Sequence, residues 1–219
     1  MMQRVDLYWS FRSPYSYLVT GRAVRLAEEY DVEIALRIVY PLAVRLPDYY
    51  AGLPPQRRAY FRIDPARVGE FLGVPYAAPD PDPLVIDPQT RRPALAQPHI
   101  RRLSHLGIEA VRRGRGLAFV DEISKLIWSG AVRGWDRGRH LGEAARRAGL
   151  QLEDMDAAVA AGSAECEAAL ERNGHDLDAA GHWGVPLFVV DGEPFFGQDR
   201  FDMVLWRLQQ KGLAKREGR

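Results

Sequence analysis

The chain has 219 residues, of which 47% are hydrophobic and 27% are charged. This composition is typical of a folded globular protein and excludes a disordered or fibrous one. The 30 basic and 29 acidic residues leave a formal charge of +1, so no global positive field is available to hold nucleic acid or anionic lipid. A single cysteine, Cys166, excludes an intrachain disulfide. Because no apolar run approaches the roughly 20 residues of a membrane span and no signal-peptide pattern occurs, we expect a cytoplasmic protein.

The first elements are predicted to be a strand, a helix and a second strand. Residues 5–9 alternate and are rich in β-prone types, which predicts a strand. Ser13 followed by proline is typical of a helix start, and apolar spacing continues that helix to about Tyr30. Residues 32–39 predict the second strand, which should lie parallel to the first because a helical crossover connects them.

The middle of the chain has a different character. Residues 47–98 contain most of the prolines and predict loops with one short helix near 57–72. Helical periodicity then predicts helices over 98–113, 117–128, 138–148, 153–161 and 163–180. The last part predicts a strand over 186–190, an Asp-Gly hairpin turn, a return strand over 193–196 and a helix over about 199–211.

Three short motifs could carry chemistry. The first is Ser13 at the strand-to-helix junction, where free N–H groups and the helix dipole stabilise a negative charge. A serine hydroxyl at that point can donate to an anion such as a thiolate. The same Ser-Pro step also begins an ordinary helix, so the motif alone leaves both interpretations open.

The other two motifs lie near the C-terminus. If the Val185–Pro186 bond is cis, the backbone N–H and C=O of Val185 are exposed for pairing with a peptide-like ligand, whereas an ordinary trans proline gives no such site. Residues 195–200 precede the last predicted helix. There Asp199 suits an N-cap beside a surface Arg200, and the same two residues could hold an amino-acid zwitterion.

Taken together, these motifs resemble a known family. Residues 6–18 read DLYWSFRSPYSYL and residues 184–200 read GVPLFVVDGEPFFGQDR. In this order they resemble the 2-hydroxychromene-2-carboxylate isomerases, which are related to the kappa-class glutathione transferases. The resemblance implies an α/β protein with a DsbA-like thioredoxin fold and a large α-helical insertion. Residues 1–45 and 183–219 would form the thioredoxin-like domain, and residues 46–182 the helical insertion domain.

The resemblance also implies a reaction. Family members use glutathione to convert 2-hydroxychromene-2-carboxylate, an aromatic-degradation intermediate, to trans-benzylidenepyruvate. Ser13 would hold the glutathione sulfur as a thiolate, whose pKa a helix N-terminus lowers. The thiolate would add to the conjugated substrate carbon and leave after bond rotation, so that glutathione is not consumed. Redox relatives carry cysteines where this chain has Ser13 and Ser16, which excludes thiol–disulfide exchange at this motif.

The family pattern assigns further residues. Val185 would pair with the cysteinyl backbone of glutathione. The γ-glutamyl end would be framed by Phe196, Gly197, Gln198 and Asp199, with Asp199 taking the ammonium group and Arg200 assisting. Arg45 and Arg57 would bind the carboxylate of a small aromatic oxo-acid, although a surface position is an equal alternative for Arg45.

Several expectations remain open at this stage. A homodimer is implied by the resemblance alone. No histidine pair has the spacing of a metal site, so no metal is expected. Two other functions stay possible: a kappa-like transferase that conjugates glutathione to an electrophile, and a redox-inactive thioredoxin-like module that binds a peptide.

Overall fold

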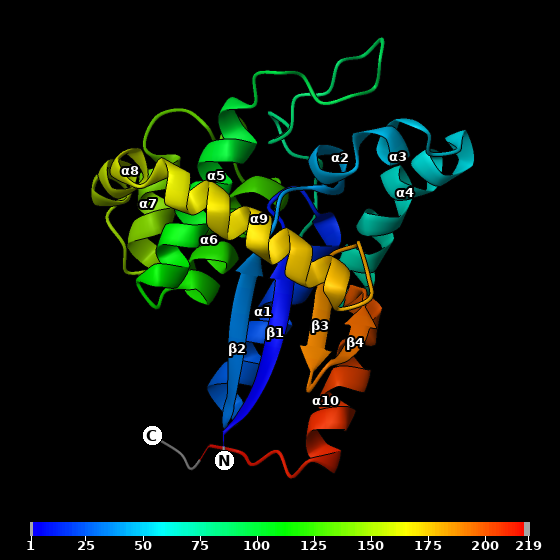
Figure 1. Cartoon of the computed structure of the whole chain (residues 1–219), viewed down its shortest axis with the longest axis vertical. Helices are drawn as coiled ribbons and strands as arrows, with labels where there is room; N and C mark the ends of the chain where they lie inside the picture. Colours follow the sequence, from blue (N-terminus) through cyan, green and yellow to red (C-terminus); the bar gives the residue numbers. More distant parts are fainter. Residues whose placement is uncertain (1, 217–219) are drawn as a thin grey trace.

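The computed structural model describes residues 2–216 and shows a four-stranded mixed sheet flanked by helices (Figure 1). The strands follow the order β2-β1-β3-β4, with β1 parallel to β2 and antiparallel to β3, and β3 antiparallel to β4. Their bounds are β1 (Gln3–Trp9), β2 (Val32–Ile38), β3 (Leu187–Val190) and β4 (Glu193–Phe196). The predicted parallel crossover and the predicted hairpin are therefore both confirmed.

The helices fall into two groups. Figure 1 shows α1 behind the sheet, α10 beside β3 and β4, and α5 to α8 gathered at the end where β1 and β2 finish. The bounds are α1 (Pro14–Glu29), α2 (Leu42–Arg45), α3 (Pro47–Ala51), α4 (Pro55–Leu72), α5 (Pro98–Arg112), α6 (Gly116–Trp128), α7 (His140–Arg147), α8 (Leu152–Ala161), α9 (Ser163–Ala179), the 3-10 helix η1 (Gln198–Arg200) and α10 (Phe201–Gln210). Helices α5 to α9 lie close to their predicted bounds.

The prediction for the proline-rich middle was incomplete. The helix predicted near 57–72 is confirmed as the 18-residue α4, which begins two residues earlier, whereas α3 was not predicted. Helix α4 begins at Pro55, and proline is well suited to the first helical position because the N–H it lacks has no partner there. A Pro-Pro step that reads as a loop is thus a helix start. Helix α4 ends at Gly73, which has a positive φ of 65°.

One continuous core joins the sheet to the helices. The same cluster of buried side chains includes Leu7 and Trp9 of β1, Leu106 of α5 and Ile123 of α6. The buried indole N–H of Trp9 donates to the hydroxyl of Thr20 on α1 at 2.9 Å. The predicted division into residues 1–45 with 183–219 and residues 46–182 stays a prediction. Within residues 2–216, no helix has the length and apolar character needed to cross a membrane.

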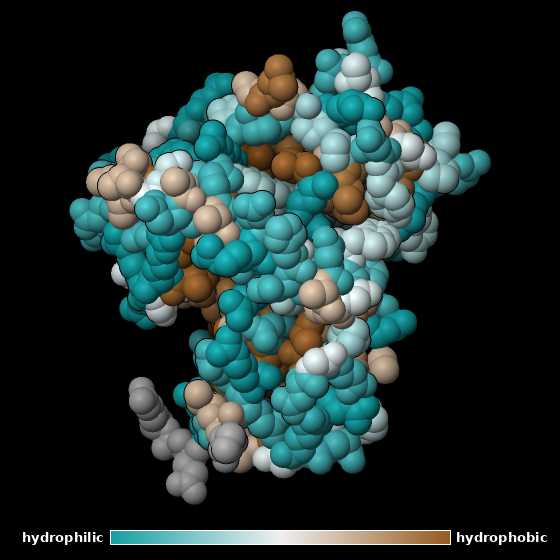
Figure 2. Space-filling model, viewed as in Figure 1, coloured by the Kyte–Doolittle hydropathy of each residue, from teal (hydrophilic) through white to brown (hydrophobic). Residues whose placement is uncertain are grey.

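The face of the molecule drawn in Figure 2 is mostly polar. Figure 2 shows hydrophobic residues mainly in hollows where elements meet, including one beside α2. Trp206 on α10 is 47% exposed. Its neighbour Arg207 covers one face of the indole, with the guanidinium 4.6 Å from the ring centre.

Candidate functional site

Ser13 lies at the junction where the chain leaves β1 and enters α1. It is the N-cap of α1, and its Oγ accepts a hydrogen bond from the Ser16 N–H at 3.2 Å. Pro14 is the first helical residue, and the first turn contains no acidic side chain. Free N–H groups at a helix start carry a partial positive charge. The predicted helix start is confirmed, and the Ser13 hydroxyl lies where an anion is stabilised.

Val185 lies against Ser13 although 172 positions separate them. The Val185–Pro186 peptide is cis, which was the condition for the predicted backbone site. Ser13 Oγ donates to the Val185 carbonyl oxygen over 3.4 Å, which is long for a hydroxyl donor. Among the described residues, none accepts a hydrogen bond from the Val185 N–H. Both backbone polar groups of Val185 can therefore engage a ligand.

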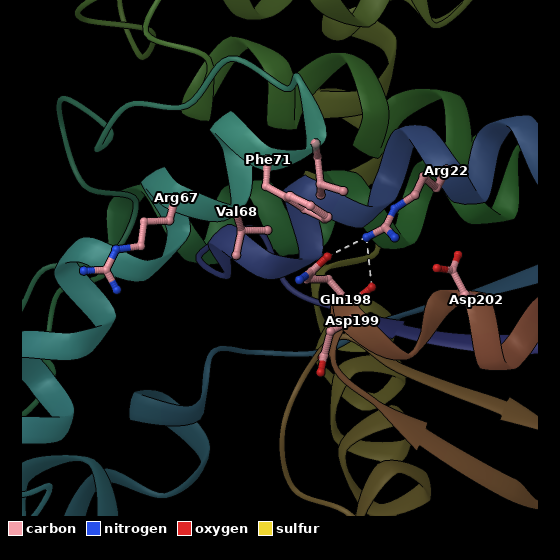
Figure 3. A pocket seen from close by; sticks show the side chains of 8 residues that line it. Arg22, Arg67, Val68, Phe71, Gln198, Asp199 and Asp202 are labelled. Carbon is pink, nitrogen blue, oxygen red and sulfur yellow. Dashed lines mark hydrogen bonds between the residues drawn. The ribbon is translucent and has the colours of Figure 1, made fainter.

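The turn after β4 is tied to this loop and to α1. The Gly197 N–H donates to the Pro186 carbonyl at 2.9 Å. Gly197 has a φ of 104°, and a Cβ at this position would collide with Asp199, so only glycine fits. From α1, Arg22 Nη2 donates to the Gln198 carbonyl at 2.8 Å and to its Oε1 at 2.6 Å (Figure 3). Burial lowers the pKa of Arg22, and these bonds hold the turn in place.

A cavity of about 320 Å³ lies between this turn and α4 (Figure 3). One wall carries Gln198, Asp199 and Asp202, and the wall formed by α4 carries Arg67 with apolar side chains such as Phe71. The cavity therefore offers carboxylates and a guanidinium together, as a zwitterion requires. The N-cap expected at Asp199 was wrong, because Asp199 lies inside η1 and α10 begins only after Arg200. Arg200 Nη1 instead donates to the Asp199 carboxylate at 2.9 Å.

An aromatic cluster lies on the α3 and α4 side of the loop. The Trp183 ring is 5.1 Å from the Tyr49 ring. The Arg57 guanidinium lies 5.8 Å from the Trp183 ring centre and 5.6 Å from that of Phe61. Arg57 also donates to the Tyr49 hydroxyl at 3.0 Å. Phe61 in turn contacts Tyr15 with ring centres 6.5 Å apart, so the cluster reaches the turn that follows Ser13.

This aromatic cluster, which comprises Tyr49, Arg57, Phe61 and Trp183, is open to solvent. Tyr49 is 39% exposed and Phe61 is 41% exposed. Rings beside a guanidinium suit a planar anion, whose ring can pack on the aromatic faces while its carboxylate pairs with the cation. Sequence reasoning indicated Arg57 but missed the aromatic rings around it. The only available signal was the position of Trp183 directly before the Gly-Val-Pro motif.

Arg45 is not a surface residue. Its side chain is 12% exposed, and burial lowers its pKa. Nε donates to the Tyr40 carbonyl at 2.9 Å and Nη2 donates to the Trp183 carbonyl at 2.6 Å, while Nη1 lies 3.8 Å from Asp178. The alternative of a solvent-exposed arginine was therefore wrong. Arg45 supports the loop that carries Trp183 and Val185, and its contact with substrate stays a prediction.

A second contact fastens α4 to the site. The Tyr15 hydroxyl donates to the Asp64 carboxylate at 2.6 Å. Burial, together with this hydrogen bond to Asp64, raises the pKa of Tyr15 well above its usual range. Tyr15 is therefore a neutral hydroxyl that joins the first turn of α1 to α4, which carries Arg57 and Phe61.

Comparison with known proteins identifies the family. Residues 4–209 match the DSBA-like thioredoxin domain family, and the chain belongs to it. Within this class the chain is 23% identical over 223 residues to the 2-hydroxychromene-2-carboxylate isomerase of Pseudomonas putida, with 91% of each protein covered. This finding confirms the resemblance that the two terminal motifs indicated.

Two solved structures show the same fold. A structure of HCCA isomerase superposes with a TM-score of 0.68 at 18% identity, covering 94% of this chain and 95% of that one. The cytosolic disulfide reductase DsbM from Pseudomonas aeruginosa with GSH superposes with a TM-score of 0.60 at 15% identity, covering 94% and 99%. The disulfide chemistry named for DsbM does not extend to this chain, because its single cysteine, Cys166, is buried in α9.

Proposed function

We propose that this chain is a glutathione-dependent isomerase of the 2-hydroxychromene-2-carboxylate type, acting in aromatic compound degradation. The observation that carries the proposal is the Ser13 hydroxyl, which stands at the N-terminus of α1 and 3.4 Å from the backbone of Val185. This position provides a hydrogen-bond donor and a positive potential for a bound thiolate, and the motif at residues 13–16 contains no cysteine that could be oxidised. The isomerase relative supports the reaction, and the DsbM structure with GSH supports the choice of thiol.

The residues beside Ser13 fit a γ-glutamyl tripeptide. The Val185 N–H lacks a protein acceptor among the described residues, so it is free to pair with a peptide carbonyl. The cavity beside Asp199 offers partners of both charges for an amino-acid end. In this proposal Val185 holds the cysteinyl backbone and Asp199 holds the ammonium group. The γ-glutamyl end is framed by Phe196, Gly197, Gln198 and Arg200.

When bound, glutathione supplies a thiolate that can add reversibly to a conjugated carbon. The contribution of Ser13 is to donate a hydrogen bond from its hydroxyl to the anion. The hydroxyl proton is directed at the Val185 carbonyl over 3.4 Å, and so weak a bond is easily exchanged for a charged acceptor. The N–H groups of the first turn of α1 add to the positive potential and lower the pKa of a thiol held there.

The aromatic cluster is proposed to receive the substrate, a small aromatic oxo-acid. Arg57 pairs with the substrate carboxylate, while the substrate ring packs on Trp183 and Phe61. Arg45 supports this cluster indirectly, because its hydrogen bond to the Trp183 carbonyl fixes the loop that bears the Trp183 ring.

The proposal also includes a homodimer. It includes a cytoplasmic location, which the cytosolic relative DsbM supports.

Calorimetric titration with glutathione, followed by an isomerisation assay, tests the proposal. We expect the protein to bind glutathione and to convert 2-hydroxychromene-2-carboxylate while the glutathione concentration stays constant. Stoichiometric consumption of glutathione would instead indicate a transferase that uses the same site. Absence of binding at millimolar glutathione would contradict both activities and leave the peptide-binding module.

A further inference from the structure

His182 contacts two parts of the candidate thiol site. Its ring stacks on Phe196 at the end of β4, with ring centres 3.8 Å apart and an interplanar angle of 22°. It also stacks on Trp183, with ring centres 5.0 Å apart. His182 Nδ1 accepts a hydrogen bond from the Gly184 N–H at 2.8 Å. One side chain thus links the loop that bears Val185 to the strand end proposed to frame the γ-glutamyl group.

The loop has little room to adopt another position while these contacts hold. A Cβ on Gly184 would lie 2.5 Å from Phe196 Cε2 and 3.0 Å from His182 Cε1. The backbone of Gly184 is therefore packed directly against both rings. The next residue is Val185, whose carbonyl accepts the hydrogen bond from Ser13. The contacts form a continuous series from His182 through Gly184 and Val185 to Ser13.

We propose that His182 is a positioning residue of the thiol site, which holds the Gly184–Val185 backbone in its binding geometry only while Nδ1 is unprotonated. A neutral imidazole that accepts at Nδ1 carries its proton on Nε2. Protonation places a second N–H opposite the Gly184 N–H and replaces the hydrogen bond with repulsion. Val185 then loses its fixed orientation, so affinity for the thiol ligand falls. This inference rests on the proposed function.

The surroundings of His182 define the pH range and the controls. Burial lowers the pKa of His182 from its usual value of 6.5, so the change falls below that pH. Among the described residues, His182 forms no ion pair, and the rings that it stacks on do not titrate. The charged groups on the neighbouring elements include Arg45, Arg57, Asp178, Glu193, Asp199 and Arg200. Asp178 is the acidic member on the Trp183 side, where it lies 3.8 Å from Arg45, and it provides a control substitution.

S-methylglutathione is the suitable probe because its sulfur cannot ionise, which removes the titration of the thiol itself. We expect calorimetry to show that wild-type affinity falls about fivefold to tenfold between pH 7.5 and pH 5.0, the change that corresponds to one lost hydrogen bond. His182→Phe keeps a ring for stacking but has no acceptor, so it should bind weakly at both pH values. His182→Asn keeps an acceptor that does not titrate, so it should bind tightly at both. Asp178→Asn should retain the wild-type profile.

Two results would overturn the inference while leaving the proposed function in place. One is a wild-type pH profile in His182→Phe, and the other is binding by His182→Asn that is no tighter than that of His182→Phe. If the wild-type protein binds neither glutathione nor S-methylglutathione at pH 7.5, the proposed function fails.

In that case, hydrogen exchange of the Gly184 amide tests the role of His182 independently of ligand binding. A protection factor that falls below pH 6.5 in wild type but not in His182→Asn supports it, and equal protection overturns it.

Discussion

The two sides of the candidate site are built in different ways. On the thiol side, Val185 and Gly197 act through backbone groups and Ser13 acts through its hydroxyl, and all three lie next to the ends of strands of the sheet. On the substrate side, Tyr49 and Arg57 act through side chains on α3 and α4, and only two of the 18 residues of α4 are buried. The comparison shows that the positions of the residues on the thiol side are determined by the fold. The substrate side can change without cost to the core, so we expect substrate specificity to be set there.

Gly184→Ala should cause the largest loss of glutathione affinity among the predicted substitutions. The new Cβ would lie 2.5 Å from Phe196 Cε2, and overpacking of this kind costs about 1–3 kcal/mol. If the loop moves to relieve the clash, glutathione affinity should fall about tenfold to 100-fold. Gly142→Ala on α7 is a matched control, because its Cβ would meet nothing nearer than 3.8 Å. Calorimetry showing unchanged binding in Gly184→Ala would contradict the close packing of this loop.

Arg57→Gln should affect only the substrate side. The substitution removes the cation beside Trp183 and Phe61, so the KM for the oxo-acid should rise about tenfold, as expected for one lost ion pair at a partly exposed site. Glutathione affinity should stay within about twofold of wild type. Steady-state kinetics and calorimetry on the same preparation separate the two effects. A parallel loss of glutathione affinity would show that the two sides are not independent.

Glu167→Gln tests a polar cluster outside the site and should have the smallest effect on binding. Burial would raise the pKa of Glu167, but hydrogen bonds with His105 and Tyr40 outweigh it and hold that pKa below its usual range. A carboxyl group whose pKa is lower in the folded protein than in the unfolded chain stabilises the fold at pH values above the unfolded-state pKa. This stabilisation disappears as the pH falls through the folded-state pKa. The variant should lose about 1–2 kcal/mol of unfolding free energy at pH 7.

Urea unfolding at pH 7 and near pH 3 measures this loss. The difference between Glu167→Gln and wild type should shrink at the lower pH, where the wild-type carboxylate becomes protonated. Glutathione affinity at pH 7 should be unchanged. An equal loss of stability at both pH values would refute the electrostatic origin of the effect.

The parts of the fold that depend on local signals could be predicted from the sequence. The Ser13 cap begins α1, and the Asp191-Gly192 turn has positive φ values of 49° and 84°, as the hairpin signal indicated. Helix α4 was predicted over 57–72, and only its start at Pro55 was missed, because proline marks both loops and helix starts. The terminal halves and most of α4 were therefore predictable, whereas α3 was not.

For the site, the sequence indicated which side chains have suitable chemistry. It did not indicate which of them already form hydrogen bonds within the protein. Arg45 is occupied by the carbonyls of Tyr40 and Trp183, and the second of these lies 138 positions away. No local pattern reports such a contact. His182 resembles an isolated histidine until the fold places it on Phe196 and under the Gly184 N–H. Its position directly before the Trp-Gly-Val-Pro segment was the one available signal.

The most direct test of the account is proton release on glutathione binding to wild type, Ser13→Ala and Ser13→Thr. Calorimetry at pH 7 in two buffers of different ionisation enthalpy measures this release. If Ser13 stabilises a thiolate, wild type and Ser13→Thr should release up to one proton, because a free thiol of pKa about 8.5 is mostly protonated at this pH. Ser13→Ala should bind about tenfold more weakly and release clearly less. Equal affinity and equal proton release in all three proteins would contradict the role of Ser13.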